Sequence, residues 1–262
     1  MDDLVLREDA GGVARLTLNA PERLNALSDG MIAALRARLN ETGGNEAVRC
    51  VVIAGAGRAF CAGHDLREMQ AARQAPDGGA AAHRDLFDRC AAMMLSITRH
   101  PRPVIAEVHG VAVAAGCQLA ATCDMVVAEE SARFGVNGVN IGLFCSTPMV
   151  ALSRAVPRKA AFEMLTTGRL VHAEEAQRLG LVNRIAPEGG LRAATDELAE
   201  AVASKLGSAV RIGKEAFYRQ AEMTLQDAYS YTGGVMATNL SDDDTSAGID
   251  AFLGKRPMPW AT

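Results

Sequence analysis

Two glycine-bearing segments contain the residues best suited to chemistry, residues 58–66 and residues 109–124. Each follows an apolar run predicted to be a buried strand, and its small residues allow a ligand to approach the main chain closely. The second segment enters a helix near Gly116, where free N–H groups and the helix dipole favour negative charge. Two N–H groups converging from these loops would form an oxyanion hole. Tight packing explains the glycines equally well.

Several polar side chains accompany these loops. His64 follows a glycine and could serve as a general acid/base or bind a carboxylate, although a hydrogen bond within its loop is the favoured interpretation. Cys145 has no neighbouring cation in the sequence, which favours a buried inert thiol over a nucleophile. We expect Asp65 and Asp124 to stabilise a loop and a helix end. Gln118, Asn140, Ser146 and Thr147 complete the set.

The elements that must position these residues alternate between strand and helix. Apolar runs predict strands at residues 4–6, 13–19, 50–54, 104–106 and 125–128, with helices after Ser28, at residues 80–98 and from Gly116. Within the first hairpin, Ala14, Leu16 and Leu18 share one face, and Arg15 and Thr17 the other, which is typical of a half-buried strand. This order predicts a layered α/β fold. From residue 191 to 253 the spacing is helical.

Composition excludes several classes of protein. The chain has 262 residues, of which 49% are hydrophobic and 4% aromatic, and its net charge is −4. These values indicate one large globular domain, or one domain with a small appendage, and argue against a nucleic-acid partner. The six cysteines form no Cys-x-x-Cys pair, so we predict no metal site. The N-terminus lacks an apolar signal core, and polar residues interrupt the most apolar stretch. We therefore expect a cytoplasmic protein without a membrane span.

The order of short motifs resembles the enoyl-CoA hydratase/isomerase (crotonase) family. The resemblance runs from about residue 19 to 256, and its motifs are Ala-Phe-x-Ala-Gly-x-Asp-Leu at 59–66, Gly-x5-Gly-x-x-Leu-Ala-x-x-Cys-Asp at 110–124, Phe134-Gly135, Thr167-Gly168, Glu175-Ala176 and Gly180-Leu181-Val182. It implies a crotonase (ClpP-like) spiral of ββα units over residues 1–195. It also implies a helical trimerisation region over residues 196–262, and homotrimers that often pair into hexamers.

The same resemblance assigns roles to individual residues. The backbone N–H groups of His64 and Ala115 would polarise the carbonyl of an acyl-CoA thioester and stabilise its enolate. The thioester is the only ligand implied, without a further cofactor. Lys255 or Arg256 would reach its phosphates from a neighbouring subunit, or form a solvated basic pair. The remaining residues expected along the coenzyme or substrate are Arg58, Ala59, Phe60, Ala62, Asp65, Leu66, Gly116, Asn140 and Cys145.

At two catalytic positions the sequence departs from the hydratases of this family. Hydration needs an acid/base pair, for which two carboxylates are suited. The hydratases carry glutamates at the places occupied here by Gln118 and Gly138, and we expect these two residues and Ser146, in the loop that follows, at the catalytic positions. An amide cannot take a proton from water at neutral pH. We predict that Gln118→Glu with Gly138→Glu raises hydration.

Three hypotheses about function follow. The first is a hydratase-like enzyme of fatty-acid or acyl-CoA metabolism that stabilises an enolate. The second is a decarboxylase or hydrolase of the same fold, since loss of CO₂ itself generates the enolate. Gly63-His64-Asp65 and the segment at 139–142 resemble acyl-CoA decarboxylases of this family, although those carry a tyrosine near the place of Cys145. The third is a non-catalytic acyl-CoA binder, which the absent glutamates favour.

Overall fold

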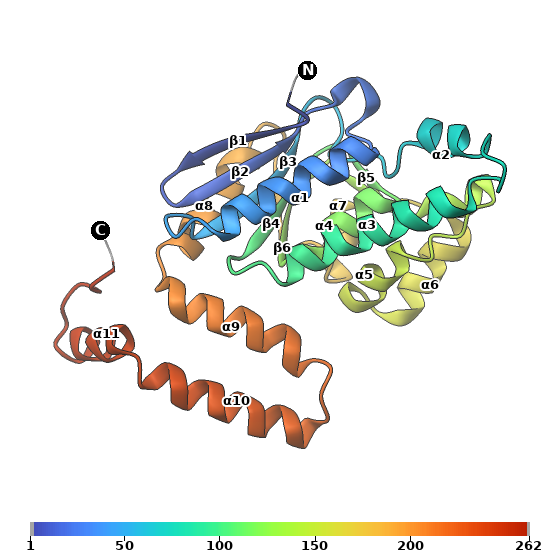
Figure 1. Ribbon diagram of the computed structural model, residues 1–262. Coiled ribbons are helices and arrows are strands. Elements are labelled where there is room, and N and C mark those ends of the chain that lie inside the picture. Colours follow the sequence, from blue (N-terminus) through green and yellow to red (C-terminus); the bar gives the residue numbers. More distant parts are fainter. Residues whose placement is uncertain (1–2, 261–262) are drawn as a thin grey trace.

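The computed structural model describes residues 3–260 and contains two β-sheets surrounded by helices (Figure 1). The larger sheet has the order β1-β2-β3-β4-β6-β9, and only the β1–β2 pair is antiparallel. Its strands are Val5–Ala10, Val13–Leu18, Cys50–Gly55, Val104–Val108, Met125–Glu129 and Arg184–Ala186. The smaller sheet consists of β5 (Val111–Val113), β7 (Arg133–Gly135) and β8 (Val171–His172). The predicted α/β fold is confirmed.

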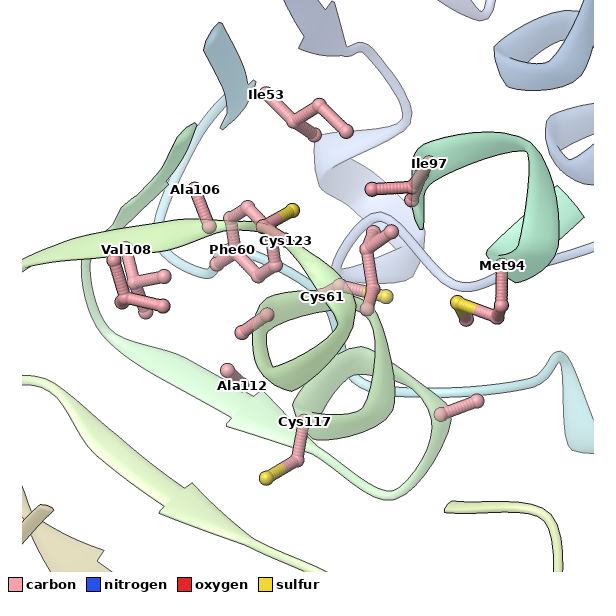
Figure 2. Packing of buried hydrophobic residues seen from close by; sticks show 14 of the residues in the cluster. Ile53, Phe60, Cys61, Met94, Ile97, Ala106, Val108, Ala112, Cys117 and Cys123 are labelled. Atoms are coloured by element: carbon pink, nitrogen blue, oxygen red, sulfur yellow. The ribbon is translucent and has the colours of Figure 1, made fainter. Parts of the chain in front are cut away.

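Helices cover both faces of the larger sheet, so its central strands are buried on both sides. Val51 and Ile53 face the main core, whereas Cys50 and Val52 face α8 (Leu191–Ala203). The main core also receives α1 (Asp29–Gly43), α3 (Ala80–Thr98) and α4 (Ala115–Thr122). Figure 2 shows Phe60 and Cys61 among these buried side chains. The other helices before α8 are η1 (Pro21–Arg23), α2 (Leu66–Ala72), η2 (Asn137–Ile141), α5 (Pro148–Ala155), α6 (Arg158–Thr167) and α7 (Ala173–Arg178).

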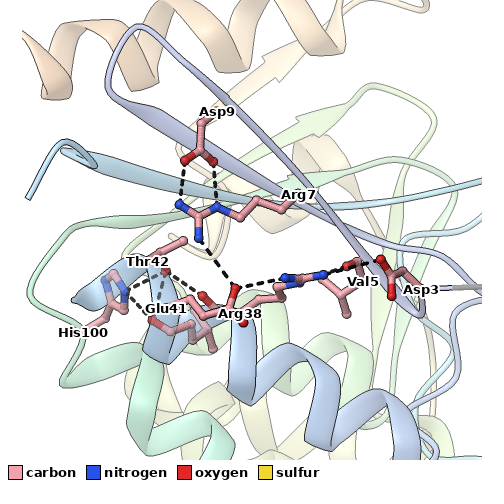
Figure 3. Close-up of polar contacts among 9 residues, drawn as sticks. Asp3, Val5, Arg7, Asp9, Arg38, Glu41, Thr42 and His100 are labelled. Atoms are coloured by element: carbon pink, nitrogen blue, oxygen red, sulfur yellow. Dashed lines mark hydrogen bonds and ion pairs between the residues drawn. The ribbon is translucent and has the colours of Figure 1, made fainter. Parts of the chain in front are cut away.

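The first hairpin is held on α1 by polar contacts (Figure 3). Arg38 Nε donates to the Val5 carbonyl over 3.3 Å, and Arg38 Nη1 donates to Glu41 over 3.0 Å. Arg7 forms two hydrogen bonds with Asp9, of 2.8 and 2.6 Å. Beside Glu41, near the carboxyl end of α1, the Thr42 hydroxyl lies 3.1 Å from His100 Nε2, which joins α1 to the turn after α3.

Arg15 on β2 differs from the half-exposed residue that its alternation predicted. Ala14, Leu16 and Leu18 are fully buried as expected, but Arg15 is only 4% exposed. Its Nη1 lies 2.7 Å from Glu107 Oε2, an ion pair without hydrogen-bond geometry, and its Nη2 donates to Asp196 over 2.7 Å. Asp196 belongs to α8, which covers this face of the sheet. A helix distant in sequence therefore buries a side chain that the strand pattern leaves in solvent.

The last three helices extend away from the sheets (Figure 1). They are α9 (Gly207–Gln220), α10 (Leu225–Leu240) and α11 (Asp243–Leu253). The boundary predicted between residues 195 and 196 falls inside α8, which packs on the sheet, so the extension begins at α9. Among residues 3–260, no helix combines the length and apolar character needed to cross a bilayer.

Candidate active site

A cavity of about 610 Å³ opens beyond the carboxyl ends of β3 and β5. Residues that were predicted along the coenzyme or substrate form part of its wall: Arg58, Ala62, His64, Asp65, Leu66, Ala115, Gly138, Asn140, Cys145 and Ser146. Much of the rest is apolar, contributed by Leu24, Met69, Phe87, Val113, Ile141, Leu143 and Phe144. The size and lining suit a small molecule that is largely apolar at one end.

Two backbone N–H groups, those of His64 and Ala115, come from adjacent loops that line this cavity. A Cβ placed on Gly63 would lie 3.2 Å from the Ala115 nitrogen and 2.9 Å from the Ala114 Cβ, so only glycine allows this approach. Ala115 is the first residue of α4, where an N–H has no partner inside the helix. Within residues 3–260, neither N–H donates a hydrogen bond.

Ala114 holds the backbone in a conformation that alanine rarely adopts. Its φ is 50° and its ψ is −120°, a combination favoured by glycine. The Ala114 N–H donates to the Gly135 carbonyl over 2.8 Å, and the Ala114 carbonyl accepts from the Gln118 N–H over 3.0 Å. These bonds fix the turn that directs the chain into α4. Strained residues of this kind often occur at functional sites.

Substitution of Ala114 by glycine tests this strain. We expect Ala114→Gly to raise the free energy of unfolding by about 0.5–1 kcal/mol, because relief of ~1–3 kcal/mol of strain exceeds the entropic cost of glycine. Urea denaturation measures the change. Ala121→Gly, inside the same helix, is the matched control and should instead lower stability by about 1 kcal/mol. A loss of stability in Ala114→Gly would show that the turn carries no strain.

The His64 side chain packs into the protein, and its ring nitrogens are not presented to the cavity. Nδ1 lies 3.3 Å from the Leu27 carbonyl, while Nε2 is buried and has no partner within residues 3–260. The ring meets Phe87 edge to face, with centroids 5.7 Å apart. Burial lowers the pKa of the imidazole, which therefore stays neutral at pH 7. The ring is therefore held by Leu27 and not, as the sequence had favoured, by its own loop. What His64 can offer to a ligand in the cavity is its backbone N–H group.

Comparisons with known proteins show the family of this chain. The family model for enoyl-CoA hydratase/isomerase matches residues 8–262. The chain belongs to this family. Mouse enoyl-CoA hydratase domain-containing protein 3, mitochondrial, is 42% identical over 250 residues, covering 95% of this chain and 82% of that protein.

Solved structures of related proteins share the fold. Human enoyl-CoA hydratase domain-containing protein 3 superposes with a TM-score of 0.93 at 39% identity, covering 98% of this chain and 100% of that one. A Mycobacterium smegmatis enoyl-CoA hydratase has a TM-score of 0.94 at 50% identity, covering 99% of each chain. The predicted crotonase fold is therefore confirmed.

In this crotonase chain, position 138 has no room for a side chain. A Cβ on Gly138 would collide with the Leu143 carbonyl oxygen and lie 2.8 Å from Cys145 Sγ. The Leu143 N–H also donates to the Gly138 carbonyl over 3.0 Å, which fixes the two segments together. Gln118 is buried in α4 away from the cavity wall, and its Oε1 has no partner within residues 3–260. Positions 118 and 138 therefore carry no carboxylate, and the space that a side chain at 138 would need is filled by other atoms.

This packing argues against the prediction that two glutamates would raise hydration. We now expect Gln118→Glu with Gly138→Glu to add no measurable hydration of crotonyl-CoA, because the new side chain at 138 must displace the segment containing Leu143. Gly138→Ala alone should lower the free energy of unfolding by about 1–3 kcal/mol through overpacking. An absorbance assay and urea denaturation measure the two effects, with Gln118→Glu alone as the control. A clear gain of hydration in the double variant would contradict this account.

Some of the other predicted residues line the cavity, and some do not. Asp65 caps α2, accepts from the Arg67 N–H over 2.8 Å and lies 3.3 Å from Arg23, so it stabilises its loop as predicted. Burial raises the pKa of the Cys145 thiol, which agrees with an inert thiol. Ala59, Phe60, Gly116, Gln118 and Lys255 do not line the cavity. Ala59 and Phe60 are instead buried where the loop after β3 joins the core.

Sequence reasoning missed part of the wall. Glu22, Arg23, Leu24, Met69 and Phe87 line the cavity, yet none belongs to the glycine-bearing loops. Phe87 lies on α3 beside its buried residues and is itself partly buried, and an aromatic residue in a helix of this kind signals only core packing. Consecutive positive φ values at Leu24 and Asn25, both 53°, mark the turn that presents Leu24. Among residues 3–260, no group of three His, Cys, Asp or Glu residues is placed to hold a metal ion.

Proposed function

We propose that this protein binds an acyl-CoA thioester and stabilises the enolate derived from it. The thioester oxygen accepts hydrogen bonds from the N–H groups of His64 and Ala115. The observation that carries the proposal is that both residues line one largely apolar cavity and that neither amide has a partner within residues 3–260. Donors of this kind stabilise charge that develops on oxygen, and one donor typically contributes about 3–4 kcal/mol to the transition state.

The residues of the cavity wall favour some reactions of an acyl-CoA thioester over others. No carboxylate lies on the wall formed by residues 137–148, and position 138 cannot accept one without movement of the chain. Reactions in which bond cleavage itself generates the enolate, such as decarboxylation, fit this wall better than hydration of a double bond. Hydrolysis of the thioester is an alternative, in which water attacks the carbonyl, the two amides bind the oxygen of the tetrahedral intermediate, and the CoA thiolate leaves. We place the protein in fatty-acid or acyl-CoA metabolism on this basis.

A non-catalytic acyl-CoA binder is the second candidate. The filled position 138, the amide at Gln118 and the buried ring of His64 favour it, because none of the three offers the cavity a group that transfers protons. The unpartnered amides favour an enzyme, since a binder gains little from donors aimed at developing charge.

Thermal shift followed by turnover separates the two candidates. A panel of acyl-CoA esters is tested for stabilisation, and each stabilising ester is then assayed for hydration, isomerisation, hydrolysis and decarboxylation. At 100 times the Kd, a ligand adds about 2.7 kcal/mol, which raises Tm by roughly 5–10 °C. Stabilisation without turnover supports the binder. A protein that no ester stabilises more than free CoA does would overturn both candidates.

Self-association is a further part of the proposal. The extension formed by α9, α10 and α11 exposes large apolar side chains, among them Phe217, Leu225, Tyr229, Met236, Leu240 and Phe252, which are 61–75% exposed. A monomer rarely leaves so much apolar surface in water. We propose a homotrimer, or a pair of trimers, with these helices at the interface and Lys255 close to a neighbouring subunit. The cytoplasmic location stays a prediction, and the vertebrate relatives are mitochondrial proteins.

Charge placed on the extension tests this interface. We expect Leu240→Asp with Phe252→Asp to convert the assembly to monomers, because burying two carboxylates against apolar surface costs several kcal/mol. Analytical ultracentrifugation measures the mass. The exposed Leu95 lies on α3, outside the extension, and Leu95→Asp should leave the mass unchanged. An assembly that persists in the double variant would place the interface elsewhere.

A further inference from the structure

A cluster of arginines lies at the amino-terminal ends of strands in the larger sheet, and the cavity lies at the opposite ends of these strands. Arg49 directly precedes β3 and Arg102 precedes β4, and the parallel pairing of these strands brings their amino ends to one edge. Arg211 lies in the second turn of α9, four residues after Gly207 and therefore on the same side of the helix. The repulsion of Arg49 and Arg211 adds to burial in lowering the pKa of Arg102, and Glu46 is the one acid that acts against it. Three positive charges therefore gather with little compensation.

The three guanidinium groups have few hydrogen-bond acceptors near them. Within residues 3–260, none of the three guanidinium groups lies within 4.0 Å of a carboxylate, and Arg49 Nη2 donates to a main-chain carbonyl, that of Lys205, over 2.9 Å. The Nε atoms of Arg49 and Arg102 are buried and have no partner in the same part of the chain. Buried donors without acceptors are uncommon in folded proteins and call for an explanation.

The amino end of α9 adds free N–H groups and the positive end of a helix dipole to this cluster. The Arg49 guanidinium lies against Gly207, where an added Cβ would be 2.8 Å from Nε and 2.9 Å from Cζ. This position puts a cation at the positive end of a helix dipole, which is unfavourable unless an anion is present. The first turn has no acidic residue and no side-chain cap, and the Ser208 hydroxyl is buried without a partner within residues 3–260.

We propose that Arg49, Arg102, Arg211 and the first turn of α9 bind a phosphate-type oxyanion. The ligand is free phosphate or the phosphate of a small phosphate monoester. Its charge offsets the three guanidinium groups and the helix dipole together, and its oxygens accept from the guanidinium N–H groups and from the N–H groups of the first turn. Because this edge is opposite the cavity, the site is separate from the one proposed for the thioester. A bound anion would join the sheet to the start of the helical extension.

Titration of the full-length protein with inorganic phosphate tests the site. At constant ionic strength, phosphate should raise Tm in a saturable way, and chloride should not. We expect Arg211→Gln to weaken the apparent affinity about tenfold, since it removes one charged hydrogen bond. Arg211 is exposed, so this variant should fold, and Arg102→Gln should show the same direction. Arg219→Gln, in the last turn of the same helix, is the matched control and should titrate like the wild type.

AMP in place of phosphate identifies the source of the anion. A stronger response to AMP assigns the site to a phosphate monoester, and an equal or weaker one assigns it to the free ion. The proposal is overturned if phosphate acts no more strongly than chloride. It is also overturned if Arg211→Gln responds to phosphate as the wild type does. Neither result bears on the binding of acyl-CoA esters, which the thermal shift panel measures separately.

Discussion

Replacing Ala115 by proline in an Ala114→Gly background is expected to lower kcat for an acyl-CoA substrate by about 10²- to 10³-fold. Proline has no N–H, so the substitution removes one of the two donors proposed to bind the thioester oxygen. Ala115 is the first residue of α4, the helix position that proline tolerates best. Glycine at 114 is needed because the ψ of −120° brings the Ala114 Cβ close to the following nitrogen, where the proline ring must fit.

The Ala114→Gly variant is the reference for this measurement, since it carries the same turn with the N–H intact. Free CoA has no thioester carbonyl, so its Kd should be the same in the two variants. That equality would show that the proline ring leaves the coenzyme part of the cavity open. A kcat within a factor of three of the reference would mean that the Ala115 amide contributes nothing to the reaction. If no ester is turned over, the Kd of a bound thioester replaces kcat, with a smaller expected change.

Loss of the Asp124 carboxylate should lower the free energy of unfolding by about 3–5 kcal/mol, the cost of leaving a buried charge unpaired. Lys214 on α9 is 9% exposed, and its Nζ donates to Asp124 Oδ2 over 2.6 Å. It also donates to the carbonyls of Ile97 and Arg102 over 2.9 and 3.0 Å. Asp124 accepts in addition from the Tyr218 hydroxyl over 2.7 Å and from the Val104 N–H over 2.6 Å. Asp124→Asn leaves the ammonium group buried beside two carbonyls.

Urea denaturation of Asp124→Asn and Lys214→Met, singly and together, measures this contribution. The two substitutions should be less destabilising together than the sum of the single effects, because the second removes the charge that the first leaves unpaired. The exposed pair Arg184–Glu197, 3.0 Å apart, is the matched control, and Glu197→Gln should change stability by less than about 1 kcal/mol. Additive losses would show that the pair does not act as a unit. Limited proteolysis should also cut α9 faster in Asp124→Asn, because these contacts hold it on the core.

Local features of the sequence were enough to predict much of the fold. The apolar runs at 50–54, 104–106 and 125–128 became β3, β4 and β6, since a strand buried on both faces needs no polar residue. The small residues of the sequence marked the glycine-bearing loops. Gly63 shows why this works, since its positive φ of 93° and its close approach to Ala114 both require glycine. The family motifs added the expected order of elements. Each of these signals depends on residues that are neighbours in the chain.

The tertiary structure alone decided what the site can do. Whether position 138 has room for a side chain depends on where residues 143 and 145 pass. The burial of His64 Nε2, the place of Phe87 in the cavity wall and the ion pairs of Arg15 and Lys214 likewise depend on elements far apart in sequence. Periodicity and backbone freedom are set by covalent neighbours, so a sequence records them directly. Distances between remote segments follow from the path of the whole chain, so only the folded structure fixes which atoms meet.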